Sequence, residues 1–198
     1  MKRNLLIISV LTTLALSGCV PSLNPLYTEK DLVFDPALIG TWAEENNSSD
    51  TWAFEKDTDK SYKLVVTEKG DAREYKIHLV KLGSSLFLDF YPEDSLREVK
   101  QDFYKAHLVP AHLFAKVSQI GDTLRFALMN PDWLDKLLKQ HPDAISHETI
   151  ENDRVVLTAS TKALQEFVSK HAGNAEAFGD PATFKRKAAT PRAEPAKK

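Results

Sequence analysis

Alternation of apolar and polar residues with a period of two is the feature that most constrains the fold of this chain. Segments with this pattern lie about 8–12 residues apart, and residues typical of turns separate them. Their apolar members are Trp42; Trp52 and Phe54; Tyr62, Leu64 and Val66; Tyr75, Ile77 and Leu79; and Leu86, Leu88 and Phe90. This pattern predicts an antiparallel meander whose strands bury one face and expose the other.

The second half of the chain changes in character. Strands are expected at 112–119 and 123–129, with short candidates at 145–150 and around 155–158. Residues 92–111 are interpreted as a long loop with one helical stretch. Short helices are predicted at about 131–140 and 161–171, where apolar residues recur with helical spacing after the N-cap residues Asn130 and Ser160. The prediction is a mainly β fold with two short helices, in one domain over residues 38–184.

The first eighteen residues have the composition of a secretory signal. Lys2 and Arg3 give a basic start, and residues 5–11 are almost wholly apolar but too few to span a bilayer. Small residues precede Cys19, as expected near a cleavage site. Residues 1–18 are therefore predicted to be a signal peptide.

The sequence Leu16-Ser17-Gly18-Cys19 resembles the lipobox of bacterial lipoproteins. The resemblance implies cleavage before Cys19, a diacylglycerol on its sulfur, and a fatty acid such as palmitate on the new amine. Two or three acyl chains would anchor the protein stably in a membrane. Val20, rather than Asp, follows Cys19, and by resemblance to Gram-negative lipoproteins this implies the periplasmic face of the outer membrane. An ordinary cleaved signal or an uncleaved anchor are the alternatives.

Two terminal segments differ from the predicted domain. Residues 19–37 contain three prolines without a sustained period, which indicates a lipidated tether that docks through Leu32, Val33 and Phe34. Residues 185–198 are rich in Ala, Pro and Lys, which is typical of a disordered tail. Residues 19–198 contain 24 Lys and Arg against 28 Asp and Glu, a formal charge of −4. The tail is +5, so residues 19–184 are −9.

This distribution of charge bears on possible partners. An acidic body argues against nucleic acid as a partner, whereas a basic tail could contact an anionic envelope polymer. A solvated terminus without a partner is the alternative for the tail.

Gly40-Thr41-Trp42 resembles the Gly-x-Trp entry of the lipocalins. In that family the tryptophan plugs the closed end of an up-and-down barrel, and an arginine from a late strand stacks over it. The resemblance therefore implies a lipocalin-like barrel in which Trp42 and Arg154 close one end, with Arg125 as the second candidate. A tryptophan that only fills the core at the start of a strand is the alternative.

Two sets of residues have the types that commonly bind metals. His107 and His112 lie on opposite faces of a strand at their spacing of five, and no carboxylate or thiol accompanies them. Asp57, Asp59, Ser61 and Glu68 have the spacing of calcium-loop ligands, but Tyr62 occupies the position that requires glycine. Known catalytic motifs are missing, and Cys19 is the only cysteine. We therefore expect no metal, no cofactor beyond the covalent lipid, and no enzymatic activity.

Two functions remain open. One is a lipocalin-like module that binds a small apolar ligand, such as a lipid, inside its barrel. The other is a non-enzymatic envelope scaffold with a filled β core, which binds partners on its outer surface. The barrel interior distinguishes the two functions. A ligand inside the barrel needs a cavity, whereas large inward side chains can fill a small barrel completely.

Overall fold

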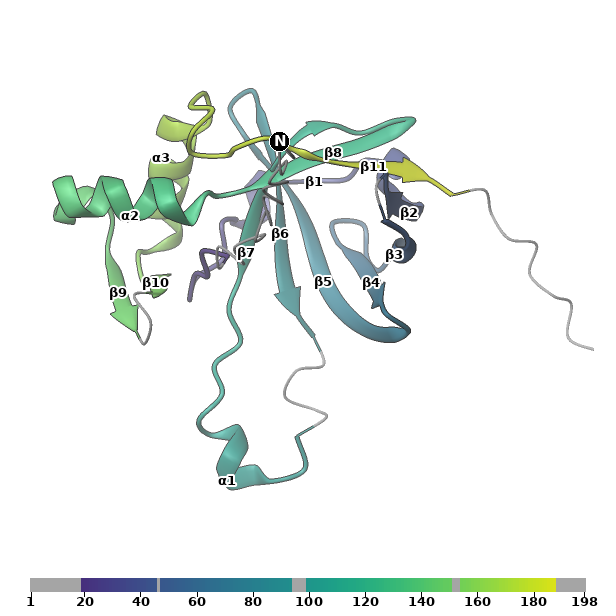
Figure 1. Ribbon diagram of the computed structural model, residues 1–198, viewed down its shortest axis with the longest axis horizontal. Coiled ribbons are helices and arrows are strands. Elements are labelled where there is room, and N and C mark those ends of the chain that lie inside the picture. Colours follow the sequence, from purple (N-terminus) through teal and green to yellow (C-terminus); the bar gives the residue numbers. More distant parts are fainter. Residues whose placement is uncertain (1–18, 46, 94–98, 151–153, 188–198) are drawn as a thin grey trace, which may run out of the picture.

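The structure is a computed structural model that describes residues 19–45, 47–93, 99–150 and 154–187. The predicted signal peptide and all but the first three residues of the predicted tail lie outside these ranges. Eight strands form the main body (Figure 1). They are β2 (Gly40–Glu44), β3 (Asn47–Lys56), β4 (Tyr62–Glu68), β5 (Asp71–Leu82), β6 (Ser85–Pro92), β7 (Leu113–Gln119), β8 (Thr123–Leu128) and β11 (Ala182–Arg186).

These strands close into an antiparallel barrel. Strands β2 to β8 pair in chain order, and β11 lies between β8 and β2, so that every barrel strand has two neighbours. The short strand β1 (Leu32–Val33) lies outside the barrel and pairs with β5. The predicted mainly β, lipocalin-like barrel is confirmed.

Local sequence explains the pairing of successive strands. Strand β4 alternates between buried and partly buried residues, as its period of two predicts. It is joined to β5 by Lys69 and Gly70, which both have positive φ and whose flanking residues Glu68 and Asp71 are paired. Two residues of positive φ match the twist of the flanking strands. This hairpin therefore fixes the register in which the apolar faces of β4 and β5 coincide.

A second layer, which we call the outer layer, follows β8 in the chain. It consists of α2 (Pro131–Gln140), η3 (Pro142–Ala144), β9 (His147–Ile150), β10 (Arg154–Leu157) and α3 (Thr161–His171). The two predicted helices are confirmed at their predicted bounds. The side chain of Asn130 accepts hydrogen bonds from Asp132 N and Trp133 N, and that of Ser160 accepts one from Ala163 N.

The structure corrects the expected positions of the last strands. Among the strands, β9 and β10 pair with each other and with no barrel strand, so they form a separate hairpin. The eighth barrel strand is β11, which includes Lys185 and Arg186 from the segment predicted to be a tail. Phe184 of β11 is buried inside the barrel, and Phe178, which precedes this strand, is buried against the outer layer.

Two hydrophobic cores lie on opposite sides of the sheet. One fills the barrel and includes Trp42, Phe54 and Tyr62. The other joins Val80, Phe87 and Phe114, from the outer side of β5, β6 and β7, to apolar residues of the outer layer. The barrel wall is therefore buried on both faces along these strands.

The loop between β6 and β7 projects beyond the barrel, and α1 (Asp102–Lys105) lies at its tip, as Figure 1 shows. This agrees with the interpretation of residues 92–111 as a long loop with one helical stretch, although residues 94–98 are not described. Hairpin β9–β10 lies to one side of the barrel, next to α2 (Figure 1).

Candidate functional site

Residues 19–38, which we call the strap, lie against the barrel from their first few residues. Cys19 is exposed, whereas Val20, Pro21 and Ser22 are already buried. Ser22 exchanges backbone hydrogen bonds of 2.9 and 2.8 Å with His112, before β7. Leu157 N donates to Pro21 O and Leu23 N donates to Leu157 O, so the strap joins the barrel to β10. The predicted tether is therefore docked close to Cys19 and does not begin to dock only at Leu32.

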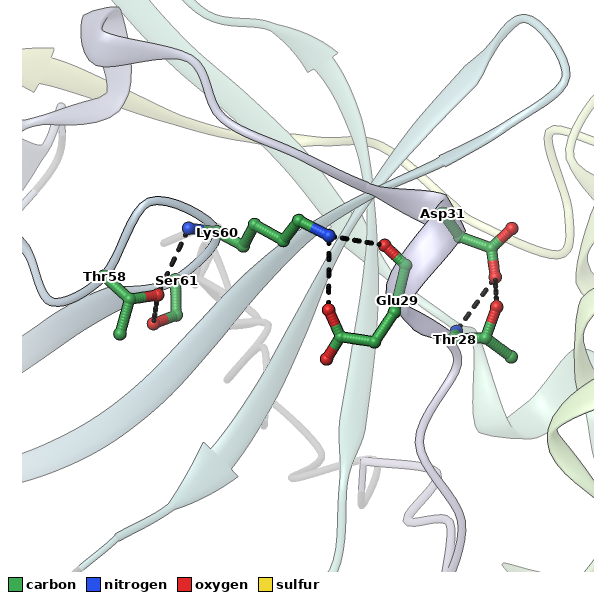
Figure 2. Close-up of polar contacts among 6 residues, drawn as sticks. All are labelled: Thr28, Glu29, Asp31, Thr58, Lys60 and Ser61. Carbon is green, nitrogen blue, oxygen red and sulfur yellow. Dashed lines mark hydrogen bonds and ion pairs between the residues drawn. The ribbon is translucent and has the colours of Figure 1, made fainter.

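Further contacts hold the rest of the strap in place. Gln165 Nε2 of α3 donates to Leu26 O and to an Asp31 carboxylate oxygen at 2.9 and 2.8 Å. At η1 (Glu29–Asp31), Lys60 Nζ lies 3.0 Å from Glu29 O and 3.2 Å from Glu29 Oε2, as Figure 2 shows. These polar contacts tie the strap to α3 and to the turn between β3 and β4.

The strap ends in η2 (Pro36–Leu38), which covers one end of the barrel. Tyr62 Oη donates to Asp35 O at 3.1 Å and accepts from Asp35 N at 2.6 Å. Burial raises the pKa of Tyr62 to about 12, so this phenol stays protonated and can donate. Phe34 stacks on the same ring with centroids 4.7 Å apart. This end of the barrel is thus closed by chain preceding the first barrel strand.

Trp42 and Arg186 complete this closed end. Trp42 has no exposed surface, and its Nε1 donates to Leu38 O at 2.9 Å. The Arg186 guanidinium lies over the Trp42 ring, 4.1 Å from its centroid. It also donates at 2.6 Å to Ile39 O and to Ala37 O, and at 3.5 Å to Gly121 O. Arg186 therefore joins η2, the start of β2 and the turn between β7 and β8.

The structure thus corrects the arginine predicted to close the barrel. Arg154 lies in β10, outside the barrel, and Arg125 is an exposed residue of β8. Arg186 occupies the stacking position, because β11 pairs with β2 and places Arg186 opposite Trp42. Gly40 is required beside it: its φ is +136°, and a Cβ there would collide with Arg186 Nη1.

Large side chains fill the closed half of the barrel. Leu38, Trp42, Tyr62, Leu64, Ile77, Leu88 and Leu124 have no exposed surface, and Phe54 and Leu79 have 1% each. A side chain without accessible surface borders no space that a water molecule could enter. A ligand cavity in this half would have to be lined by other residues.

Aromatic side chains occupy the opposite half. Trp52 packs against Phe90, Phe126 and Phe184, with ring centroids 5.2–6.0 Å apart. Phe126 and Phe184 are stacked at 5.0 Å. Trp52 is partly exposed, whereas the three phenylalanines are 4–7% exposed. Trp52 and Phe90, which the sequence pattern places on the apolar faces of their strands, therefore pack with Phe126 and Phe184.

A buried polar cluster lies on the outer side of the wall. Asp89 has no exposed surface; one of its carboxylate oxygens accepts from Leu26 N at 2.8 Å, and the other lies 2.7 Å from His112 Nδ1. His78 pairs with Asp89 across β5 and β6 and is 8% exposed. Its Nδ1 has no hydrogen-bond partner among the described residues. The Tyr27 ring lies 4.2 Å from the His78 ring.

Burial governs the ionisation of this cluster. It lowers the pKa of His78, although the Asp89 carboxylate acts in the opposite direction. Burial and the nearby Asp89 raise the pKa of Tyr27 to about 12. His78 and Tyr27 are therefore held in their neutral forms beside a carboxylate that anchors the strap.

A groove of about 720 Å³ lies in the outer layer between α2, η3 and α3. Leu137, Ile145 and Phe167 contribute apolar surface to it, and Glu166 and Lys170 contribute charge. His171 also lines it and packs against Trp133 and Phe167, with centroids 4.8 Å from each. Burial lowers the pKa of His171. The groove has the size of a small-molecule site but is open.

The candidate metal ligands of the sequence are not brought together. His107 lies in the α1 loop, where its Nδ1 contacts Phe103 O, whereas His112 contacts Asp89. Asp57 accepts a hydrogen bond from Ser61 Oγ within the turn between β3 and β4, and Asp59 pairs with Lys56. In the described ranges, no three His, Cys, Asp or Glu side chains form a possible metal site.

The sequence held weak signals for the features that it did not predict. Arg186 follows Phe184 at a spacing of two, which is a short strand pattern beside the tail. Asp89 interrupts an apolar strand, which marks a carboxylate in need of partners.

No helix of the described part of the chain is both long and apolar enough to cross a membrane. Comparisons with family models, curated proteins and solved structures found no match to this chain.

Proposed function

We propose that this chain is an envelope lipoprotein, held at the periplasmic face of the outer membrane by acyl chains on Cys19. Its barrel serves as a non-enzymatic scaffold that presents outer surfaces to partners. The lipobox supports the anchor, and Cys19 is exposed at the start of the docked strap. Because the strap docks within three residues of Cys19, the anchor would hold the barrel close to the membrane.

The filled barrel is the observation that carries the scaffold function. A carrier of the lipocalin type needs an interior cavity, and small-molecule sites typically have about 300–1,000 Å³. Nine large inward side chains here are at most 1% exposed, and the far half holds stacked aromatic rings. This packing favours a stable platform over a carrier.

Native mass spectrometry of the mature protein, released gently from the envelope, tests this function. We expect the mass of the polypeptide plus the acyl groups and nothing more, even after incubation with envelope lipid extract. An additional mass that is lost on denaturation would contradict the scaffold and support a ligand carrier.

The anchor is tested by Cys19→Ala. This variant should lack acyl mass and leave the membrane fraction, because no sulfur remains to carry diacylglycerol. Unchanged partition into membranes would contradict the lipoprotein assignment.

The groove favours a second function, the binding of a small apolar ligand in the outer layer instead of the barrel. Its volume of about 720 Å³ and its apolar residues Leu137, Ile145 and Phe167 suit such a ligand. A photoreactive fatty acid should then label α2 and α3, and Leu137→Glu should abolish labelling. The matched change Leu128→Glu, at an exposed leucine outside the groove, should leave it intact.

A further inference from the structure

Exposed apolar side chains are unevenly distributed over the molecule. Among the described residues, six large apolar side chains are exposed: Leu23, Phe103, Tyr104, Val109, Leu128 and Ile150. All but Leu128 belong to three segments: the start of the strap, the α1 loop (residues 99–111) and hairpin β9–β10. Such clustering marks a contact surface, whereas single exposed apolar residues need no explanation.

The start of the strap connects these three segments. Ser22 is hydrogen-bonded to His112, where the α1 loop returns to the barrel, and the residues beside it bond to Leu157 at the end of β10. Cys19 is three residues before Ser22, so its Cα lies within about 10 Å of that junction. Acyl chains on Cys19 would therefore leave the protein close to the base of the α1 loop and to the end of β10.

The α1 loop has the composition of a membrane-interface segment. Phe103 is 84% exposed, Val109 72% and Tyr104 56%. Lys100 and Lys105 are close to them in sequence, and the only acidic residue among 99–111 is Asp102. Aromatic residues with adjacent lysines suit the boundary between acyl chains and anionic headgroups.

Figure 1 shows hairpin β9–β10 to one side of the barrel, pointing in the same general direction as the α1 loop, which projects much farther. Ile150, at the end of β9, is 49% exposed, and Leu23 in the strap is 46% exposed. A bilayer that receives chains from Cys19 can thus be approached by several projecting apolar side chains at once.

We propose that the α1 loop, Leu23 and Ile150 form a second membrane contact, with Phe103 and Tyr104 inserted at the headgroup boundary. This inference rests on the proposed lipid anchor. Together the acyl chains and this surface fix the orientation of the barrel, so that the closed end and the outer groove keep set positions relative to the bilayer.

The test uses the mature lipoprotein in vesicles of phosphatidylethanolamine and phosphatidylglycerol, with and without brominated acyl chains. Phe103→Trp introduces a fluorophore at α1, and Asp122→Trp introduces one in the exposed turn at the opposite end of β7. The emission of the unsubstituted protein is subtracted, because Trp42, Trp52 and Trp133 also fluoresce.

We expect the Phe103→Trp signal to shift to the blue and to lose much of its intensity in brominated vesicles. The Asp122→Trp signal should do neither. Equal quenching of both, or no quenching of the Phe103→Trp signal in protein that floats with the vesicles, would overturn the proposal. The unquenched result would point to a protein partner for the loop. Failure of the unsubstituted protein to float with the vesicles would instead contradict the anchor itself.

Discussion

Along β5, β6 and β7 both faces of the barrel wall are buried, but they are built differently. The inner face carries apolar and aromatic side chains, and the polar atoms at its closed end are paired: Tyr62 Oη with Asp35 and Trp42 Nε1 with Leu38 O. The outer face buries Ser22, His78, Asp89 and His112 among its apolar residues, and His78 Nδ1 is unpartnered among described residues.

The contrast indicates a division of roles. A closed half whose large side chains have almost no accessible surface contributes stability and a fixed shape, which is what a scaffold requires. The outer face holds the strap, the groove and the elements that project toward the proposed membrane. Function is therefore expected outside the wall, and the following variants test whether the two faces differ as this argument requires.

The largest effect is expected inside the barrel. Trp42→Ala should lower the free energy of unfolding by about 3–5 kcal/mol, because it leaves a cavity that the filled interior cannot close. Trp133→Ala in the outer layer should cost about 1–2 kcal/mol less, since Trp133 is 9% exposed and its neighbours border an open groove. Urea-induced unfolding measures both. Equal losses would mean that the two layers are packed alike.

The next effect concerns the polar cluster of the outer face. Asp89→Asn should cost about 2–3 kcal/mol, because the hydrogen bonds to Leu26 N and His112 lose the charge of their acceptor. The strap should then be released, which hydrogen exchange at Leu26 N would detect. Asp59→Asn is the control: its ion pair with Lys56 is exposed to solvent, so neither readout should change. If Leu26 N stays protected from hydrogen exchange in the Asp89→Asn variant, Asp89 does not hold the strap.

Much of the fold follows from local patterns. Period-two alternation predicts β2 to β8, and the caps Asn130 and Ser160 predict α2 and α3, because both signals arise from residues close in sequence. The Gly-x-Trp resemblance likewise predicts a buried Trp42 beneath an arginine of a late strand.

Features that depend on distant pairing were not predicted. Strand β11 has only five residues and exists because β8 and β2 leave a gap that it closes. The sequence therefore predicts Arg154 at the position that Arg186 occupies. Similarly, the prolines of the strap indicate a tether, whereas hydrogen bonds to residues far along the chain dock it. The spacing of Phe184 and Arg186 is a weak strand signal, but no local pattern encodes the pairing of β11 with β2 and β8 or the docking of the strap.

A smaller effect distinguishes the two arginines. Arg186→Met should cost about 1–2 kcal/mol, since it removes hydrogen bonds to Ile39 O and Ala37 O and the contact with the Trp42 ring. Arg154→Met should have little effect, because Arg154 is exposed in the separate hairpin. Thermal unfolding of both variants provides the comparison. A larger loss of stability in Arg154→Met than in Arg186→Met would favour Arg154, the arginine predicted from the sequence, as the residue that closes the barrel.

The smallest effect is a pH dependence that belongs to the outer face alone. Burial lowers the pKa of His78 below its usual 6.5, and that of His171 is lowered in the same way. Below about pH 6.5 the unfolded chain therefore binds more protons at these histidines than the folded protein does. The free energy of unfolding should consequently fall as the pH falls from 7 toward 5. Urea unfolding across this range measures the slope.

His78→Phe should reduce this slope while retaining an aromatic ring against Tyr27. Asp31 and Asp57 contribute in a separate window, because their pKa values are lowered from 3.8 and their stabilisation is lost only at more acidic pH. His171→Phe is the matched variant in the groove. Each of the two variants should remove the part of the pH dependence of stability that its own histidine contributes. A slope that is unchanged in both variants would show that the buried histidines of the outer face do not link folding to protons there. The two faces of the wall would then differ in packing but not in their response to pH.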